Sequence, residues 1–88
     1  MLSSKDFVQK AIDIVYEYAN ETFDKTDNVN FTKDNVYVVW CSYILGHVKA
    51  LLSTTLPDGK YYEVTYNSSN DEIYFDAYVK VHNKKIKL

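Results

Sequence analysis

The sequence contains no arginine, and all ten of its basic residues are lysines. Arginine is the residue best suited to bidentate contacts with phosphate and guanine, so its absence counts against a protein that reads nucleic-acid sequence. The formal net charge of −2 offers no general attraction to nucleic acid or to an anionic membrane. We therefore expect neither as a partner.

Cysteine, glycine and histidine are also scarce. Cys41 is the single cysteine, which excludes an intramolecular disulfide, and its apolar neighbours predict a small buried side chain. Gly46 and Gly59 are the two glycines, and neither belongs to a phosphate-binding loop. His47 and His82 lack metal-ligand spacing to the cysteine or to acidic residues. The sequence thus predicts a protein that is not an enzyme, with no metal and no cofactor.

No segment is typical of export or of membrane insertion. The N-terminus lacks the cationic start and apolar centre of a signal peptide, so we expect a cytoplasmic protein. The most apolar run, residues 36–56, is interrupted by serine, threonine, histidine and lysine. A bilayer-spanning helix needs about 20 predominantly apolar residues, so we expect no membrane contact from this run.

The composition is that of a folded domain. The chain has 88 residues, of which 47% are hydrophobic and 16% aromatic, including nine tyrosines. We expect one domain over residues 1–88, beginning with a helix over about 4–20 that Ser3 or Ser4 caps. One apolar stripe at helical spacing supports this helix: Phe7, Ala11, Ile14, Val15 and Tyr18. A polar connecting loop over residues 21–35 follows.

The rest of the chain predicts strands over about 36–45, 48–56, 60–67 and 72–82. The first is rich in β-branched and aromatic residues, although a helix beginning after Thr32 is an alternative. Gly46-His47 is predicted as a two-residue turn, and Pro57 to Gly59 as a turn that places Leu56 opposite Lys60. The last strand alternates apolar and polar residues up to His82.

These elements predict an α+β fold, with the N-terminal helix packed on a four-stranded antiparallel meander sheet. The arrangement resembles the cystatin-like one in shape, which implies no function. The helix can cover one face of the sheet. The residues expected on that core face are Tyr37, Val39, Cys41, Tyr43, Leu45, Val48, Ala50, Leu52, Tyr62, Val64, Tyr66, Ile73, Phe75, Ala77 and Val79.

The opposite face remains apolar and aromatic, with nothing but the loop 21–35 left to cover it. Loop coverage is one alternative; the other is an interface with a protein partner or with a second copy in a homodimer. The candidate binding residues on this face are Trp40, Ile44, Leu51, Tyr61, Glu63, Tyr74, Asp76 and Tyr78. The pair Glu63 and Asp76 is interpreted as solvated charges near Lys49 rather than as an acid–base or cation site.

A resemblance adds to this interpretation. The segments VYVVW, KALLSTT, DGKYYEVTYN and YFDAY, in this order, are similar to a family of small phage and prophage proteins of Gram-positive bacteria, a domain of unknown function. The resemblance also extends to the helix and to DKTDN in the loop. It implies a phage origin and a small accessory role, and it supplies no catalytic residues.

Together these observations predict a small non-enzymatic phage accessory protein. We expect it to bind a host protein and to modulate or inhibit it, for example as an anti-CRISPR-type inhibitor of a defence system. One alternative is a protein that sequesters a nucleotide or other small molecule by stacking it on Tyr61, Tyr74 and Tyr78. Another is a component of the virion or of its assembly.

Overall fold

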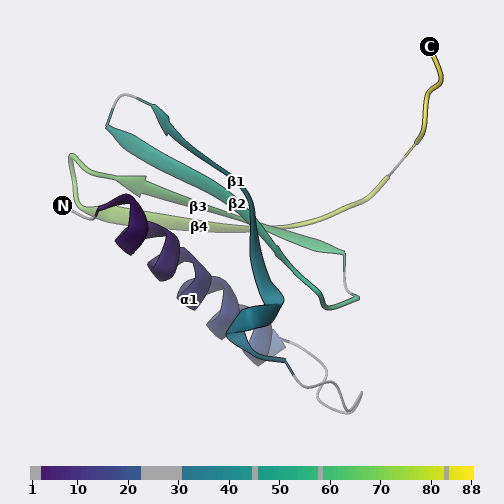
Figure 1. Cartoon of the computed structure of the whole chain (residues 1–88), viewed down its shortest axis with the longest axis horizontal. Helices are drawn as coiled ribbons and strands as arrows, with labels where there is room; N and C mark the ends of the chain where they lie inside the picture. Colours follow the sequence, from purple (N-terminus) through teal and green to yellow (C-terminus); the bar gives the residue numbers. More distant parts are fainter. Residues whose placement is uncertain (1–2, 23–30, 45, 58, 83) are drawn as a thin grey trace.

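The computed structural model describes residues 3–22, 31–44, 46–57, 59–82 and 84–88. The helix α1 and the four strands of one antiparallel sheet, in the order β1-β2-β3-β4, make up the fold (Figure 1). The predicted α+β arrangement is therefore confirmed. The element bounds are α1 Ser4–Thr22, the 3-10 helix η2 Lys33–Asn35, β1 Val36–Ile44, β2 His47–Thr54, β3 Lys60–Asn67 and β4 Glu72–Val79.

The helix begins at a serine cap and buries one apolar stripe. The backbone N–H of Asp6 donates to Ser3 Oγ over 3.2 Å, which makes Ser3 the capping residue. The hydroxyl of Thr22 donates to the carbonyl oxygen of Tyr18 over 3.0 Å at the other end. The fully buried side chains recur at intervals of four residues, so one face of the helix meets the sheet: Phe7, Ala11, Val15 and Ala19.

Aromatic rings hold the helix on the sheet at both of its ends. Near the C-terminus of α1, the ring centroid of Tyr18 lies 5.8 Å from that of Tyr62 and 5.2 Å from that of Phe75. Near the N-terminus, the ring of Phe7 lies 6.4 Å from that of Tyr66. These contacts fix how the helix lies on the sheet, because aromatic pairs contribute beyond the area they bury.

The segment that leads into β1 is attached to the helix by a small cluster. The ring of Phe31 stacks on Tyr16 at 5.4 Å, and Lys33 Nζ lies 5.9 Å from the centre of the Tyr16 ring. The same Lys33 Nζ lies 2.9 Å from Asp13 Oδ1. The predicted loop 21–35 thus contains η2 at its end, whereas residues 23–30 lie outside the described residues.

The first hairpin differs from the prediction in its turn. Ile44 pairs with His47, so the two-residue loop is 45–46 and His47 begins β2. Gly46 has a φ of +82°, the left-handed region that glycine enters without strain. The predicted Gly46-His47 turn is therefore wrong by one position, because the glycine occupies the second position of the loop.

A β-bulge in β1 changes which residues face the helix. Val38 pairs with Leu52, but Trp40 pairs with Leu51, so Val39 is an extra residue between them. An extra residue reverses the alternation of side chains before it. Val36 and Val38 consequently face the helix, and Tyr37, which was predicted to lie on the core face, faces away from it.

Cys41 is exposed, which contradicts the expected buried side chain. By pairing with Ala50 it keeps the helix side of the sheet that the sequence predicted. It nevertheless lies on β1, the outermost strand at one end of the sheet. The helix covers the buried Ala50 on the neighbouring strand and leaves Cys41 in solvent.

The second hairpin is shifted by two residues from the predicted register. Leu52 pairs with Tyr62, whereas placing Leu56 opposite Lys60 would pair it with Val64. The hydroxyl of Ser53 donates to the carbonyl oxygen of Lys60 over 2.9 Å and closes a wider loop than the expected tight turn. Because two residues are one full period of a strand, each side chain stays on its predicted face.

The last strand is shorter than its sequence pattern. The partner of Val79 is Lys60, the first residue of β3, so β4 runs out of partner there. The apolar–polar alternation continues to His82, three residues further. Residues 84–88 lie away from the rest of the molecule, at the C-terminal end of the chain (Figure 1).

Candidate functional site

The side of the sheet that is turned away from α1 is called the outer face below. The cross-strand pairing places its residues in rows that run over all four strands. Two adjacent rows make up its centre: Trp40, Leu51, Glu63 and Asp76 in one, and Tyr37, Ser53, Tyr61 and Tyr78 in the other. The outer face therefore combines five rings, counting Tyr74, with one leucine and two carboxylates.

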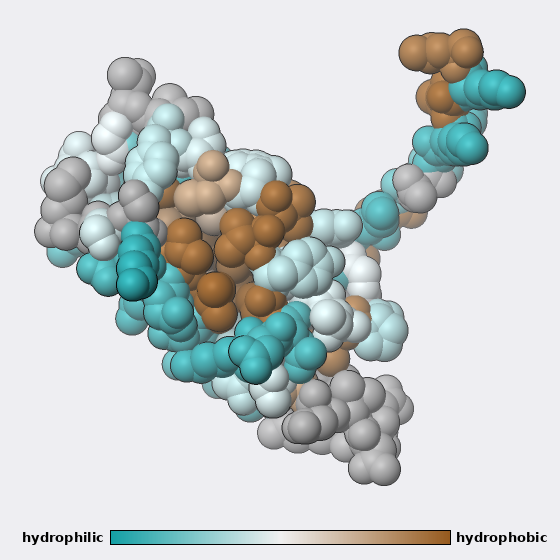
Figure 2. Space-filling model, in the orientation of Figure 1, coloured by the Kyte–Doolittle hydropathy of each residue, from teal (hydrophilic) through white to brown (hydrophobic). Residues whose placement is uncertain are grey.

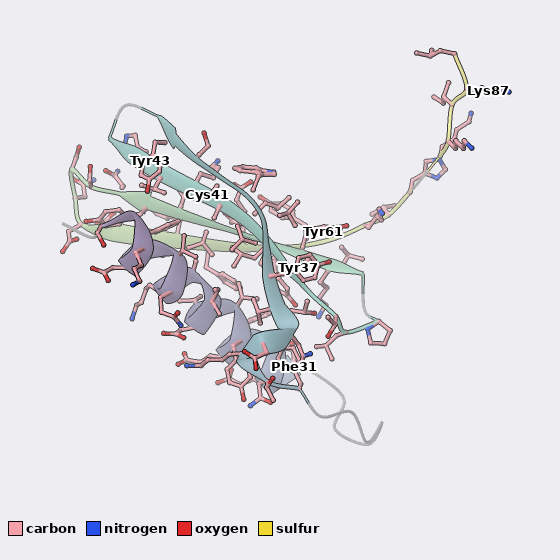
Figure 3. The ribbon with its side chains drawn as sticks, in the orientation of Figure 1. Phe31, Tyr37, Cys41, Tyr43, Tyr61 and Lys87 are labelled. Atoms are coloured by element: carbon pink, nitrogen blue, oxygen red, sulfur yellow. The ribbon has the colours of Figure 1, made fainter. Side chains whose placement is uncertain are left out.

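Four of the five rings of this face are exposed to solvent, whereas Tyr61 is half-buried. Trp40 is 42% exposed, Tyr37 47%, Tyr78 50% and Tyr74 53%. Figure 3 labels Tyr37 and Tyr61, which flank Ser53 from the strands on either side of it. Singly scattered apolar residues on a surface need no explanation, but rings that are neighbours on one face form a patch.

The charges of the outer face are arranged around its central row. Lys49 Nζ lies 3.1 Å from Glu63 Oε1, and both side chains are partly exposed. Glu63 lies directly opposite Asp76, so the two carboxylates that the sequence analysis considered as a pair are neighbours on this face. Glu63 thus has the ammonium group of Lys49 beside it, whereas the side chain of Asp76 is exposed to solvent.

A second polar contact lies at the end of the same face. The hydroxyl of Tyr74 donates to Glu72 Oε2 over 2.8 Å, and this hydrogen bond raises the pKa of Tyr74. Within the described residues, no group of three or more histidine, cysteine, aspartate or glutamate side chains could hold a metal ion. On the outer face, polar groups beside aromatic rings suit contact with the surface of another molecule.

The structure brings most of the predicted binding residues together. Trp40, Leu51, Glu63 and Asp76 share the central row, and Tyr61 and Tyr78 are cross-strand partners in the next. Tyr74 lies two positions from Asp76 along β4, on the same face. Ile44 lies opposite His47 at the end of β1, four positions from Trp40, and so stands apart from the centre.

Sequence reasoning missed Tyr37 as a member of this face. It assigned Tyr37 to the core because it extended a single alternation through the whole of β1. The sequence does carry a signal, since Val38 and Val39 are consecutive aliphatic residues that no regular alternation can place on one face. The bulge at Val39 allows the two valines before it, Val36 and Val38, to reach the core.

A second apolar surface follows the seam between α1 and β1, where Figure 2 shows apolar residues gathered. Half-buried Val8, Ile12 and Val38 pack against the core there. This surface consists of aliphatic side chains at the margin of the core. It lacks the separate group of aromatic rings and charged side chains that the outer face has. Among the described residues, no helix is long and apolar enough to cross a membrane.

Comparison with known proteins identifies the family. A model of the family of unknown function DUF6275 matches residues 8–88, so the chain belongs to that family. Neither the curated proteins nor the solved structures gave a match. The family match covers all four strands and most of the helix, so the residues of the outer face lie within the matched segment.

Proposed function

We propose that this member of the DUF6275 family is a non-enzymatic phage accessory protein whose outer face binds a host protein and inhibits it. The observation that carries the proposal is the exposure of Trp40, Tyr74 and Tyr78 on one face. Tryptophan and tyrosine are the types most enriched where truncation costs binding energy, and exposed patches of this kind mark interaction sites. Inhibition of a bacterial defence component inside the host cell is the form that the phage resemblance favours.

The layout of the face supports a protein ligand rather than a reaction. Trp40 and Leu51 form an apolar centre, and Lys49 and Glu63 form an ion pair with each other beside it. The exposed carboxylate of Asp76 is the group left to meet a partner, so we expect a lysine or arginine of the host protein opposite it. Charge pairs at the rim of an interface mainly set orientation and association rate.

The proposal is tested with a matched pair of substitutions on one strand. Trp40 and Tyr43 are both exposed rings on β1, and they lie on opposite faces of the sheet. The tagged chain is expressed in a Gram-positive host, and a stoichiometric co-purifying protein is identified and purified for calorimetric titration. We expect Trp40→Asp to weaken binding at least about 100-fold, as loss of an interface hot spot does. Tyr43→Asp should change it less than about threefold.

Two outcomes would contradict the proposal. Equal affinity of the wild type and Trp40→Asp for the purified partner would move the interface away from the outer face. A chain that holds no host protein in stoichiometric amount would leave the outer face without the proposed ligand. Self-association through this face, the homodimer predicted from the sequence, would appear as a dimer that Trp40→Asp dissociates.

One observation favours a second candidate, a ligand with an aromatic base. Tyr61 and Tyr78 are cross-strand partners, and Tyr37 lies in the same row, which sets rings on both sides of Ser53. A nucleotide could stack on such rings, since base–aromatic stacking tolerates every base. Calorimetric titration with nucleotides separates the candidates, because a heat of binding that Tyr61→Ala removes would support this one.

A further inference from the structure

The strand β4 ends the sheet and has a free edge among the described strands. The backbone N–H of Lys80 donates to the carbonyl oxygen of Gly59 over 3.1 Å, so Lys80 turns its backbone groups toward β3. Backbone groups alternate in direction along an antiparallel strand. Residues at odd positions of β4 therefore turn their N–H and C=O groups toward the free edge: Ile73, Phe75, Ala77 and Val79.

The sequence continues as a strand where β4 has stopped. The apolar–polar alternation extends through Lys80, Val81 and His82, but the pairing with β3 ends at Lys60 and Val79, apart from the one backbone hydrogen bond of Lys80 to Gly59. Val79 is 60% exposed and Val81 93% exposed as a result. An extended segment with apolar side chains on one side and no strand beside it is a template for another strand.

The two edges of the sheet differ in protection. The edge strand β1 contains the bulge at Val39, a device that discourages pairing with another chain. The pairing of β3 with β4 is regular over its whole length, and β4 contains no proline and no lysine. The helix reaches β4 at Phe75, through the ring of Tyr18, but Ala77 and Val79 further along the helix side of β4 are exposed.

We propose that two copies of this chain pair along β4, antiparallel about a two-fold axis at Ala77, and that the paired strand extends to His82. A two-fold axis through Ala77 places Phe75 opposite Val79 of the second copy and Ile73 opposite Val81. Each apolar side chain on the helix side then meets an apolar one. A register centred one residue earlier would set Asp76 against Asp76 of the second copy, and like charges directly opposite destabilise a sheet.

The distribution of charge favours this pairing. Residues 80–88 carry four lysines and no acidic residue, whereas residues 1–79 carry six lysines and twelve acidic residues, a formal charge of −6. In the antiparallel pairing the basic tail of one copy runs past Asp71 and Glu72 of the other, both of which are exposed. Lys80 would lie opposite Tyr74, and His82 opposite Glu72.

The dimer is independent of the proposed function. It joins two four-stranded sheets edge to edge and leaves Trp40 uncovered on the outer face of each copy. Loss of host-protein binding in Trp40→Asp therefore says nothing about the β4 edge. Conversely, a dimer that Trp40→Asp dissociates would show face-to-face association and would overturn the pairing along β4.

The first test compares substitutions at two aliphatic residues of the tail by sedimentation equilibrium of the full chain. Val81 and Ile86 are both highly exposed apolar residues, and only Val81 lies within the paired strand. We expect a dimer whose dissociation constant rises at least about tenfold in Val81→Lys, because the symmetric interface contains the change twice. Ile86→Lys should change it less than about twofold. A monomer at all concentrations, or an equal effect of the two substitutions, would overturn the proposal.

The second test fixes the register by crosslinking. In a Cys41→Ser background, Ala77→Cys places one thiol on each side of the two-fold axis, at a Cα separation of about 5.5 Å, which a disulfide can span. Val79→Cys is the control, because its two copies lie about 13 Å apart along the antiparallel pair. Mild oxidation should give a covalent dimer for Ala77→Cys and none for Val79→Cys. The reverse result, or no crosslink at either position, would refute pairing about Ala77.

Discussion

Trp40 and Leu51 are cross-strand partners on the outer face, whereas Val38 is the partner of Leu52 on the helix side. The extra residue Val39 separates these two pairs, and without it the first half of β1 would turn its valines outward. The bulge thus serves both faces, because it supplies buried aliphatic side chains to the core and leaves Tyr37 and Trp40 together on the outer face.

The two consecutive leucines of β2 predict losses of stability of different size for the same change. Leu52 is fully buried, so Leu52→Ala should lower the free energy of unfolding by about 3 kcal/mol through lost burial and a residual cavity. Leu51 is only half-buried on the outer face, so Leu51→Ala should cost about 1 kcal/mol or less. Urea unfolding measures both values. Equal losses would mean that the outer face is covered.

The two glycines predict a difference that isolates one contact. Both have positive φ, +82° at Gly46 and +66° at Gly59, so alanine at either position should cost about 1 kcal/mol of backbone strain. A Cβ at Gly46 would also lie 3.3 Å from Ser68 Oγ, whereas one at Gly59 would meet open space. We expect Gly46→Ala to be the more destabilising of the two in thermal unfolding. Equal midpoints would show that Ser68 moves aside freely.

The exposure of Cys41 predicts a thiol that reacts in the folded state. A disulfide reagent in excess should label one thiol per chain without denaturant, at a rate similar to that in denaturant, because the side chain is open to solvent. The reaction is followed by absorbance of the released thiolate. Labelling that requires denaturant would restore the buried position predicted from the sequence.

The faces of β3 and β4 could be predicted from the sequence because alternation is local and has a period of two residues. The register error in the second hairpin was also two residues, so Tyr61 and Glu63 stayed on the predicted face. Tyr37 was assigned to the wrong face because the bulge adds one residue to β1. A shift of one residue moves each side chain before the bulge to the opposite face of the sheet. The bulge is set by how β1 fits the core, which involves residues far apart in the chain.

The contact between Asp13 and Lys33 predicts a pH dependence of stability. The hydrogen bond from Lys33 lowers the pKa of Asp13, and the same contact raises the pKa of Lys33. A carboxylate with a lowered pKa contributes stability above its unfolded pKa, and this contribution is lost as pH falls through the folded pKa. A lysine with a raised pKa contributes fully below its unfolded pKa, and that contribution is lost as pH rises through the folded pKa.

The midpoint of thermal unfolding of the wild type should therefore exceed that of Asp13→Asn by a nearly constant amount between about pH 5 and pH 9. The difference should be small, about 3 °C or less, because both side chains are partly exposed and solvent screens the pair. It should shrink as pH falls through the lowered folded pKa of Asp13, vanish once the carboxyl is protonated in both the folded and the unfolded chain, and shrink in high salt. Lys33→Met serves as the matched control: in its background, Asp13→Asn should have little further effect at any pH. A difference that persists at low pH would assign the loss to the Gln9 side chain, which donates to Asp13 Oδ1 over 3.1 Å, rather than to the charge of Lys33.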